Sequence, residues 1–168
     1  LLEFERSVAA HFEAADLNAL VRERLQPVFS GPTPVPILWE LADHLPKVSC
    51  RPDQVLVVCV HLLDNALWAA RTRVVFRTEA ADGQVAIAVW DDGSGVPEEY
   101  RERLFDPFFT TRKDEGGTGL SLCLSQRVVQ MHQGRLYLDP ATETGACFRV
   151  ELPASGPALE AIPEPVAD

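Results

Sequence analysis

Hydrophobic residues recur at three- and four-residue intervals between residues 52 and 70, which predicts a long, buried helix. Pro52 suits the first turn of such a helix, and the apolar positions form one broad face. These positions are Val55, Leu56, Cys59, Leu62, Leu63 and Leu67. The pattern also predicts a shorter helix over residues 118–132, with Gly134 as its C-cap.

Short apolar runs bounded by turn residues predict strands in the rest of the chain. The predicted strands cover residues 35–41, 74–78, 84–90, 135–138 and 146–152. Ala81-Asp82-Gly83 provides the turn of one hairpin, and the last two strands form another. This order of elements predicts an α/β sandwich (α+β), with helices packed on one face of a mixed β-sheet.

The two ends of the chain carry weaker patterns. Residues 1–12 place Leu1, Phe4 and Val8 on one face, which predicts the end of a helix. Asp16 is a suitable N-cap for the next helix. Residues 27–36 and 43–51 are predicted to be connections. The tail after Pro153 is rich in Pro, Ala and Glu, and we expect it to be disordered.

Composition limits the choice of function. The chain has 168 residues and a net charge of −10, which suits one domain and argues against nucleic acid as the main partner. Four cysteines without Cys-x-x-Cys spacing indicate reduced thiols of a cytoplasmic protein. No apolar run is long enough to span a membrane. The chain begins with Leu1, so we expect it to be part of a longer protein.

Two glycine-bearing turns bracket a segment with the composition of a lid. Asp91-Asp92-Gly93-Ser94-Gly95 follows an apolar run, where a fixed carboxylate can accept a hydrogen bond from a ligand amine. Gly116-Gly117-Thr118-Gly119 precedes a predicted helix, where free N–H groups favour an anion such as phosphate. Residues 105–113 lie between the turns and combine aromatic side chains with hydroxyls and two cations. We refer to residues 105–117 as the lid.

These segments together resemble the conserved boxes of sensor histidine kinases. Asp-x-Gly-x-Gly, Phe105-Asp-Pro-Phe-Phe-Thr-Thr111 and Gly117-Thr-Gly-Leu120 are similar, in order and spacing, to the G1, F and G2 boxes. This ATPase family includes gyrase, mismatch-repair and heat-shock chaperone ATPases, and the Phe-Phe-Thr-Thr form resembles the nitrogen-regulation branch of the kinases. The resemblance covers residues 16–153 and implies the Bergerat ATP-binding fold.

The resemblance also implies which residues bind ATP. Asp91 is expected to accept a hydrogen bond from the adenine amine, and the glycines after it are expected to let the adenine approach. The second turn is expected to donate hydrogen bonds from its backbone N–H groups to the phosphates. The expected ATP-binding residues are Asn65, Asp91, Gly93, Gly95, Phe109, Thr111, Arg112, Lys113, Gly117, Thr118, Gly119 and Leu120. Phe105, Phe108 and Phe109 could also be core residues, and we expect at least one of them to be.

His61 and Asn65 lie four residues apart on one face of the long predicted helix. They match the N box, in which the residue at the position of Asn65 ligates Mg²⁺, an ion that prefers oxygen ligands. Asn65 could instead hydrogen-bond a neighbouring loop. His61 departs from the pattern, since most relatives carry Asn there. It could order a metal-bound water, contact phosphate, or be a packed core histidine. His61 and Asn65 are the candidate catalytic residues.

Three further positions depart from the family pattern. Trp68 stands where many of the kinases have Lys, Ser121 replaces the usual second Gly, and Cys147 replaces a Thr that helps Asp91 hold adenine. One phosphate contact and one hydrogen bond near adenine are therefore in question.

The resemblance implies the catalytic domain of a two-component sensor histidine kinase. Such a domain transfers the γ-phosphate of ATP, with Mg²⁺, to a histidine on a dimerisation domain outside this chain. We expect residues 1–15 to end the dimerisation helix, 16–153 to form the catalytic domain and 154–168 the tail. The expected partners are the parent's own dimerisation domain, in a homodimer, and a response regulator.

Two alternatives remain at this point. The departures at His61, Trp68, Ser121 and Cys147 would suit a degenerate module that binds nucleotide or a protein partner without kinase activity. An ATPase or protein-serine kinase of the same superfamily is the other alternative, although the form of the lid and the helix before Asp16 weigh against it.

Overall fold

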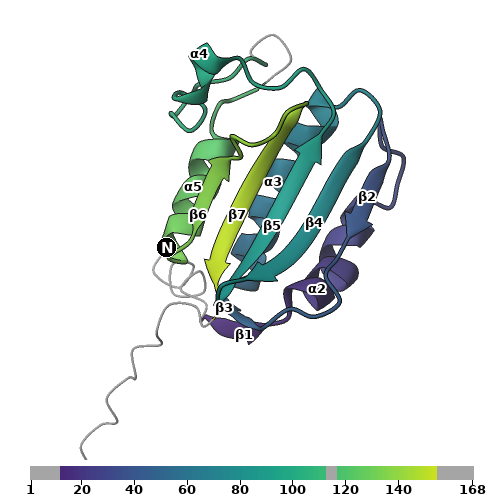
Figure 1. Cartoon of the computed structure of the whole chain (residues 1–168), viewed down its shortest axis with the longest axis vertical. Coiled ribbons are helices and arrows are strands. Elements are labelled where there is room, and N and C mark those ends of the chain that lie inside the picture. Colours follow the sequence, from purple (N-terminus) through teal and green to yellow (C-terminus); the bar gives the residue numbers. More distant parts are fainter. Residues whose placement is uncertain (1–11, 113–116, 155–168) are drawn as a thin grey trace, which may run out of the picture.

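Five strands form one mixed sheet, and helices cover one of its faces (Figure 1). The computed structural model describes residues 12–112 and 117–154. Across the sheet the strands are β2 (Ile37–Glu40), β4 (Val74–Ala81), β5 (Gln84–Asp91), β7 (Ala146–Pro153) and β6 (Arg135–Leu138). β2 and β4 run parallel, and the other neighbours are antiparallel. The sheet confirms the predicted fold class.

Two helices pack side by side against the sheet. They are α3 (Pro52–Ala69), which lies against β4 and β5, and α5 (Ser121–Met131), which lies against β6. Of the apolar face predicted for α3, Val55, Cys59, Leu62 and Leu63 are buried, whereas Leu56 and Leu67 are only partly buried. α5 buries Ser125 and Val129. A third helical segment begins at α2 (Leu17–Leu20), where the Asp16 carboxylate caps the Ala19 N–H at 3.2 Å as predicted, and continues as a π-helix (Val21–Leu25) and a 3₁₀ turn (Gln26–Phe29).

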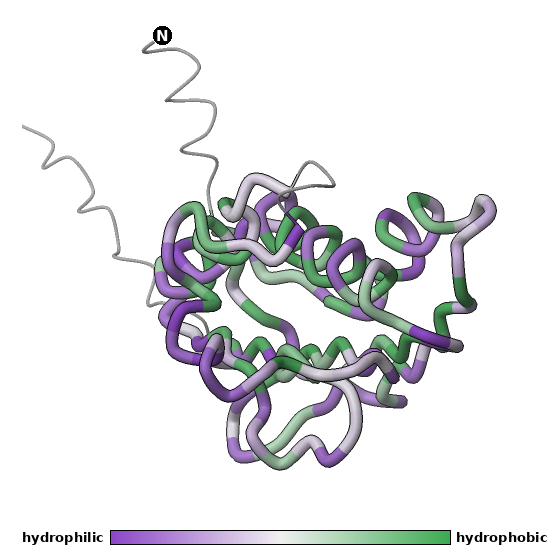
Figure 2. Tube along the Cα trace, turned by 90° about the horizontal axis from the view of Figure 1, so that it is seen from above, coloured by the Kyte–Doolittle hydropathy of each residue, from purple (hydrophilic) through white to green (hydrophobic). Residues whose placement is uncertain are grey.

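The hydrophobic core lies between the helices and the sheet. Figure 2 shows hydrophobic residues along the strands and along the helical turns that face them. The most deeply buried large side chains include Leu17, Leu25, Leu62, Leu63, Phe76, Ile87 and Leu152. All four cysteines are free, and burial raises the pKa of Cys59 to about 12. None of the described helices is long and apolar enough to cross a membrane.

A second, two-stranded sheet was not predicted. β1 (Glu13–Ala15) pairs antiparallel with β3 (Val48–Cys50). Residues 13–15 were expected to end a helix, and residues 48–50 lie within a predicted loop, so both predictions are wrong for these residues. Strands of three residues are too short to show a period, and their pairing depends on a contact distant in sequence. Residues 1–11, the rest of the predicted helix, lie outside the described residues, as do residues 155–168.

The end of α5 differs in detail from its prediction. Gln133, with φ 56°, takes the left-handed position that was expected of Gly134. The N–H of Gly134 donates to the Val129 carbonyl at 2.9 Å, and that of Gln133 to the Gln130 carbonyl at 2.9 Å, which completes a Schellman motif. Gly134 is needed for another reason: a Cβ there would overlap the Glu151 carbonyl of β7.

The face of the sheet without helices carries paired charges. Arg149 lies 2.8 Å from Glu79 and also contacts Glu151, and the Arg77 Nε donates to Glu40 at 2.8 Å. The Arg77–Glu40 pair joins the neighbouring strands β4 and β2, and the Arg149–Glu79 pair reaches across β5 from β7 to β4. The ligand-binding chemistry therefore has to be sought at the ends of the strands or around the helices.

Candidate functional site

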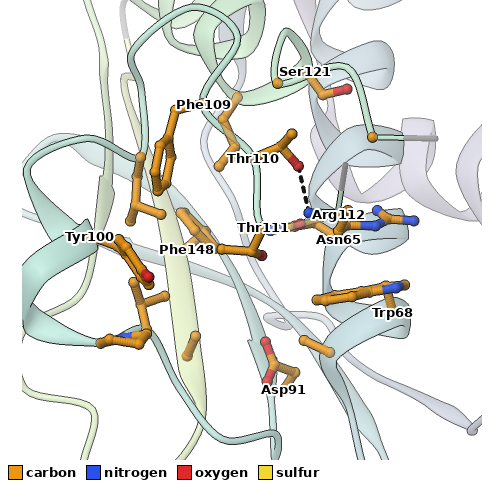
Figure 3. A pocket seen from close by; sticks show the side chains of 18 of the residues that line it. Asn65, Trp68, Asp91, Tyr100, Phe109, Thr110, Thr111, Arg112, Ser121 and Phe148 are labelled. Atoms are coloured by element: carbon orange, nitrogen blue, oxygen red, sulfur yellow. Dashed lines mark hydrogen bonds between the residues drawn. The ribbon is translucent and has the colours of Figure 1, made fainter. Parts of the chain in front are cut away.

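A cavity of about 180 Å³ opens where β5 ends and β7 begins, between α3 and the lid. Figure 3 shows Tyr100, Phe109 and Phe148 on one side, Asn65, Trp68 and Arg112 on the other, and Asp91 at one end. Of the residues expected to bind ATP, those that line the cavity are Asn65, Asp91, Gly95, Phe109, Thr111, Arg112, Gly117, Thr118 and Gly119. Segments far apart in sequence therefore converge on one cavity.

Asp91 is a buried carboxylate at the last position of β5. Asp91 is only 3% exposed, and its Oδ1 accepts a hydrogen bond from the Gly93 N–H at 2.9 Å. Burial raises the pKa of Asp91, and backbone hydrogen bonds from Gly93 and Ala146 oppose that shift. Its side chain points into the cavity (Figure 3). Asp91 can therefore accept a hydrogen bond from a ligand donor without competition from bulk water.

The adjacent carboxylate, Asp92, has a structural role. It accepts backbone hydrogen bonds from Arg71 at 2.9 Å and Thr72 at 3.0 Å, and one from the Thr72 hydroxyl. These bonds hold the pKa of Asp92 below its usual range. Asp92 thus fixes the loop between α3 and β4, while Asp91 faces the cavity.

Gly93 supports the site without lining it. A Cβ at Gly93 would overlap the Ala69 carbonyl at the end of α3, so this position needs glycine for close packing. The prediction that Gly93 contacts the ligand is therefore not matched by the cavity lining, whereas Gly95 does line it.

An apolar wall faces Asp91, and most of it was missed from the sequence. Tyr100 follows the start of the short helix α4 (Glu98–Arg101), and Leu104, Phe109 and Phe148 complete the wall. The Tyr100 and Phe109 rings lie 5.5 Å apart. The spacing of Tyr100 and Leu104, one helical turn apart, was the signal available. Such a wall suits the faces of a flat, aromatic ligand.

The three phenylalanines of the lid have three different environments. Phe105 packs edge-on against Phe148 with ring centroids 6.3 Å apart, so it belongs to the core, as expected for at least one of the three. Phe109 lines the cavity. Phe108 is 69% exposed and adopts φ 67°.

Two backbone hydrogen bonds connect the first part of the lid with Gly117 at its end and with Gly119 just beyond it. The Phe108 N–H donates to the Gly119 carbonyl at 3.0 Å, and the Gly117 N–H donates to the Arg112 carbonyl at 2.8 Å. Gly119 has φ +71°, and a Cβ there would overlap the backbone of Phe108. Lys113, expected to bind ATP, lies outside the described residues, and Leu120 does not line the cavity.

Arg112 provides positive charge at the mouth of the cavity. It is the one Lys or Arg among the described residues that line the cavity, and its guanidinium lies 4.9 Å from the centre of the Trp68 ring. Trp68 is 44% exposed, and its ring and the guanidinium are stacked in Figure 3. The position that departs from the family pattern thus holds a cation in place through its ring.

Asn65 and His61 lie on the face of α3 next to Arg112. Asn65 lines the cavity and makes no hydrogen bond with any described residue, so the alternative in which a neighbouring loop binds it is not seen. His61 lines an adjoining cavity of about 250 Å³, and its Nδ1 lies 3.1 Å from the Ser125 Oγ.

Comparison with known proteins identifies the family. Residues 50–156 match the family model described as "Histidine kinase-, DNA gyrase B-, and HSP90-like ATPase". The chain belongs to this family. The match spans α3, the cavity and the whole lid, so the family and the fold were predicted correctly from the sequence.

Relatives and solved structures of this ATPase family point to its histidine kinase members. The signal transduction histidine-protein kinase AtoS of Escherichia coli K12 is 35% identical over 158 residues, which are 91% of this chain and 26% of AtoS. The sensor histidine kinase ZraS of Klebsiella oxytoca is 30% identical over 93% of this chain and 34% of its own length. This chain therefore spans about a third or less of these curated relatives.

Solved catalytic domains have the same fold. The catalytic domain of histidine kinase ThkA superposes with a TM-score of 0.72 at 26% identity, over 86% of this chain and 96% of that domain. The histidine kinase domain of the Escherichia coli osmosensor EnvZ superposes with a TM-score of 0.67 at 29% identity. The superposition covers 85% of this chain and 89% of the EnvZ domain.

The residues of this ATPase-family site can contribute one ligand to a magnesium ion. Among the described residues, no group of three or more His, Cys, Asp or Glu side chains could hold a metal. Asn65 makes no hydrogen bond with any described residue and lines both cavities, so its amide oxygen is available to a ligand. One such oxygen fits Mg²⁺ when phosphate oxygens and waters complete the shell.

Proposed function

We propose that this chain is the ATP-binding catalytic domain of a two-component sensor histidine kinase. It would transfer the γ-phosphate of ATP to a histidine on a dimerisation domain outside the chain. The observation that carries the proposal is the convergence of Asp91, Asn65, Arg112 and the glycine-rich turn on one cavity. The kinase relatives support it over a binding module without activity.

The two sides of the cavity would bind different parts of ATP. Asp91 accepts from the exocyclic amine of adenine, while Tyr100, Phe109 and Phe148 contact the faces of the base. Thr111, Arg112 and the segment Gly117–Leu120 lie toward the phosphates, and Lys113 would add a second cation. An acidic chain needs such local positive charge to hold a triphosphate.

Phosphoryl transfer depends on positioning and neutralisation of charge more than on covalent protein chemistry. Asn65 would hold Mg²⁺, which when bound neutralises phosphate charge. Arg112, held over Trp68, would orient the outer phosphates, and His61 lies on the same face of α3. The acceptor histidine comes from the partner domain.

The wider context of the domain forms part of the proposal. The dimerisation helix would end before β1, since Glu13–Ala15 pair with β3 and belong to this domain, and residues 154–168 would form the tail. The full protein would act in the cytoplasm as a homodimer that passes phosphate to a response regulator. We propose no nucleic-acid partner and no membrane contact for this segment.

Reconstitution tests the proposed function. The chain is mixed with the dimerisation domain of its parent protein and γ-labelled ATP, and label on that domain is expected to be acid-labile and base-stable, as for phosphohistidine. Asn65→Ala should lower the transfer rate by at least about 100-fold because it removes a metal ligand near the transferring group. Gln130→Ala, on the exposed side of α5, is the control and should keep the wild-type rate. Binding of ATP without transfer would favour the degenerate module instead.

A further inference from the structure

A second cavity adjoins the nucleotide cavity between α3 and α5. Its volume is about 250 Å³, and its lining residues are His61, Asp64, Asn65, Arg112, Ser121 and Leu122. Asn65, Arg112, Ser121 and Leu122 also line the nucleotide cavity, so the two cavities lie next to each other. The second cavity differs from the first in having His61 and Asp64 and none of the aromatic wall. It therefore suits a small, charged group attached to the ligand of the first cavity.

Ser125 reaches the histidine of this cavity from α5. Ser125 is 1% exposed, and its Oγ lies 3.1 Å from the Nδ1 of His61. No other hydrogen-bond partner for this hydroxyl is found among the described residues. A buried hydroxyl that accepted from His61 would leave its own O–H without an acceptor, which is costly. The hydroxyl is therefore the donor and Nδ1 the acceptor.

This direction fixes the tautomer of His61. A neutral imidazole that accepts at Nδ1 carries its proton at Nε2. Nε2 has no partner among the described residues and is not enclosed by protein atoms, so it is open to the cavity that His61 lines. An Nε2–H group donates hydrogen bonds and does not bind a metal ion. Its ligand must present an acceptor oxygen.

We propose that Ser125 is a positioning residue that holds His61 as an Nε2–H donor to the terminal phosphate of the bound nucleoside triphosphate. The inference rests on the proposed function and deepens it, because it assigns the second cavity to the γ-phosphate. Arg112 supplies charge to the same space, and Asn65 lies between the two cavities. His61 then distinguishes ATP from ADP, since ADP lacks the group that it contacts.

Two measurements test the proposal. Long-range ¹H–¹⁵N spectra of the ¹⁵N-labelled chain report which ring nitrogen of His61 carries the proton, with the signals assigned by their loss in His61→Asn. Calorimetry gives the affinities for Mg²⁺ with a non-hydrolysable ATP analogue and for Mg²⁺ with ADP. The spectrum should show the Nε2–H tautomer. Ser125→Ala and His61→Ala should weaken the analogue by about threefold to tenfold and leave ADP unchanged. Ser125→Thr keeps the hydroxyl and should therefore bind the ATP analogue with the wild-type affinity relative to ADP.

Controls separate this role from general loss of structure. Thr78→Val removes another buried hydroxyl, one that bonds to Asn18 at 2.8 Å, and should leave the ratio of the two affinities at its wild-type value. An Nδ1–H tautomer, or equal weakening of both nucleotides in Ser125→Ala, would overturn the proposal. The spectrum is recorded on the wild-type chain, so it decides the matter even if the variants fold poorly. If the wild-type chain binds neither nucleotide, the proposed function itself is wrong.

Discussion

The floor of the nucleotide cavity and its lid are built in different ways. The floor comes from α3, β5 and β7, and its groups project from elements whose other faces are buried in the core. Among the described residues, the lid contributes Phe109 to the apolar wall and the cation Arg112 to the cavity, and two backbone hydrogen bonds connect its first part with Gly117 and Gly119. The floor is therefore preorganised by folding, whereas the position of the lid depends on a few local contacts. Substitutions in the two regions should differ in what they change.

The largest effect is expected in the floor, from Asp91→Asn. This change keeps the shape of the side chain and removes a charged acceptor from a buried site. The Kd for ATP should rise about 10- to 150-fold, equivalent to about 1.5–3 kcal/mol. Calorimetry with Mg²⁺–ATP measures it. Asp92→Asn is the matched control: it should lower the free energy of unfolding and keep the Kd, since Asp92 holds a loop. Wild-type affinity in Asp91→Asn would remove Asp91 from the adenine contact.

The next effect concerns the lid, from Gly119→Ala. A left-handed alanine costs about 1–2 kcal/mol, and its Cβ would overlap Phe108. The first part of the lid should separate from Gly119, which raises the Kd for ATP about 5- to 30-fold.

Gly83→Ala is the control for this lid variant, because Gly83 has φ +74° with no atom near its Cβ position. It should destabilise the hairpin of β4 and β5 without a change in Kd. Equal Kd values for the two variants would show that the lid does not depend on its contact with Gly119.

A smaller effect is expected where the lid meets the floor, from Trp68→Leu. Arg112 would lose its stack, worth about 0.5–1 kcal/mol, and the Kd for ATP should rise about 2- to 5-fold. Trp90→Leu removes a similar stack with Arg73, on the helix-free face of the sheet, and should leave the Kd unchanged. Tighter binding in Trp68→Leu would mean that the stack withholds Arg112 from the phosphates.

The smallest effect is one of pH on the stability of the whole domain, through His132 at the end of α5. This imidazole is 1% exposed; its Nδ1 donates to the Val128 carbonyl at 2.7 Å and its Nε2 accepts from the Arg51 N–H at 3.1 Å. Burial lowers the pKa of His132. Below about pH 6.5 the unfolded chain therefore binds a proton that the folded chain does not. The free energy of unfolding consequently decreases as the pH is lowered.

Urea unfolding at pH 7.5, 6 and 5 measures this dependence. His132→Gln can donate and accept at the same partners without titration, so its unfolding free energy should fall less between pH 7.5 and pH 5. An identical slope in wild type and variant would contradict the role of His132.

The sequence predicted the floor better than the lid. Hydrophobic periods located α3 and the long strands, because burial of a continuous face leaves a local signal, and the glycine turns marked both ends of the site. The wall formed by Tyr100 and Leu104 was missed, since its faces are defined only when α4 folds over the end of β5. β1 and β3 were missed for a similar reason: each is stabilised by a partner distant in the chain. The contact between His61 and Ser125 was also not predicted, because nothing in the sequence distinguishes Ser125 from the other polar positions of an amphipathic helix.

The register of β5 has a consequence for engineering. Its pairing with β7 runs without a bulge from Gln84 opposite Pro153 to Asp91 opposite Ala146. Gln84, which follows the turn at Asp82 and Gly83, is therefore about 24 Å from Asp91 along the strand. A reporter peptide spliced into that turn should leave nucleotide binding intact. A slip of one residue between these strands would be far more damaging, because it would exchange the faces of the strand and turn Asp91 out of the cavity.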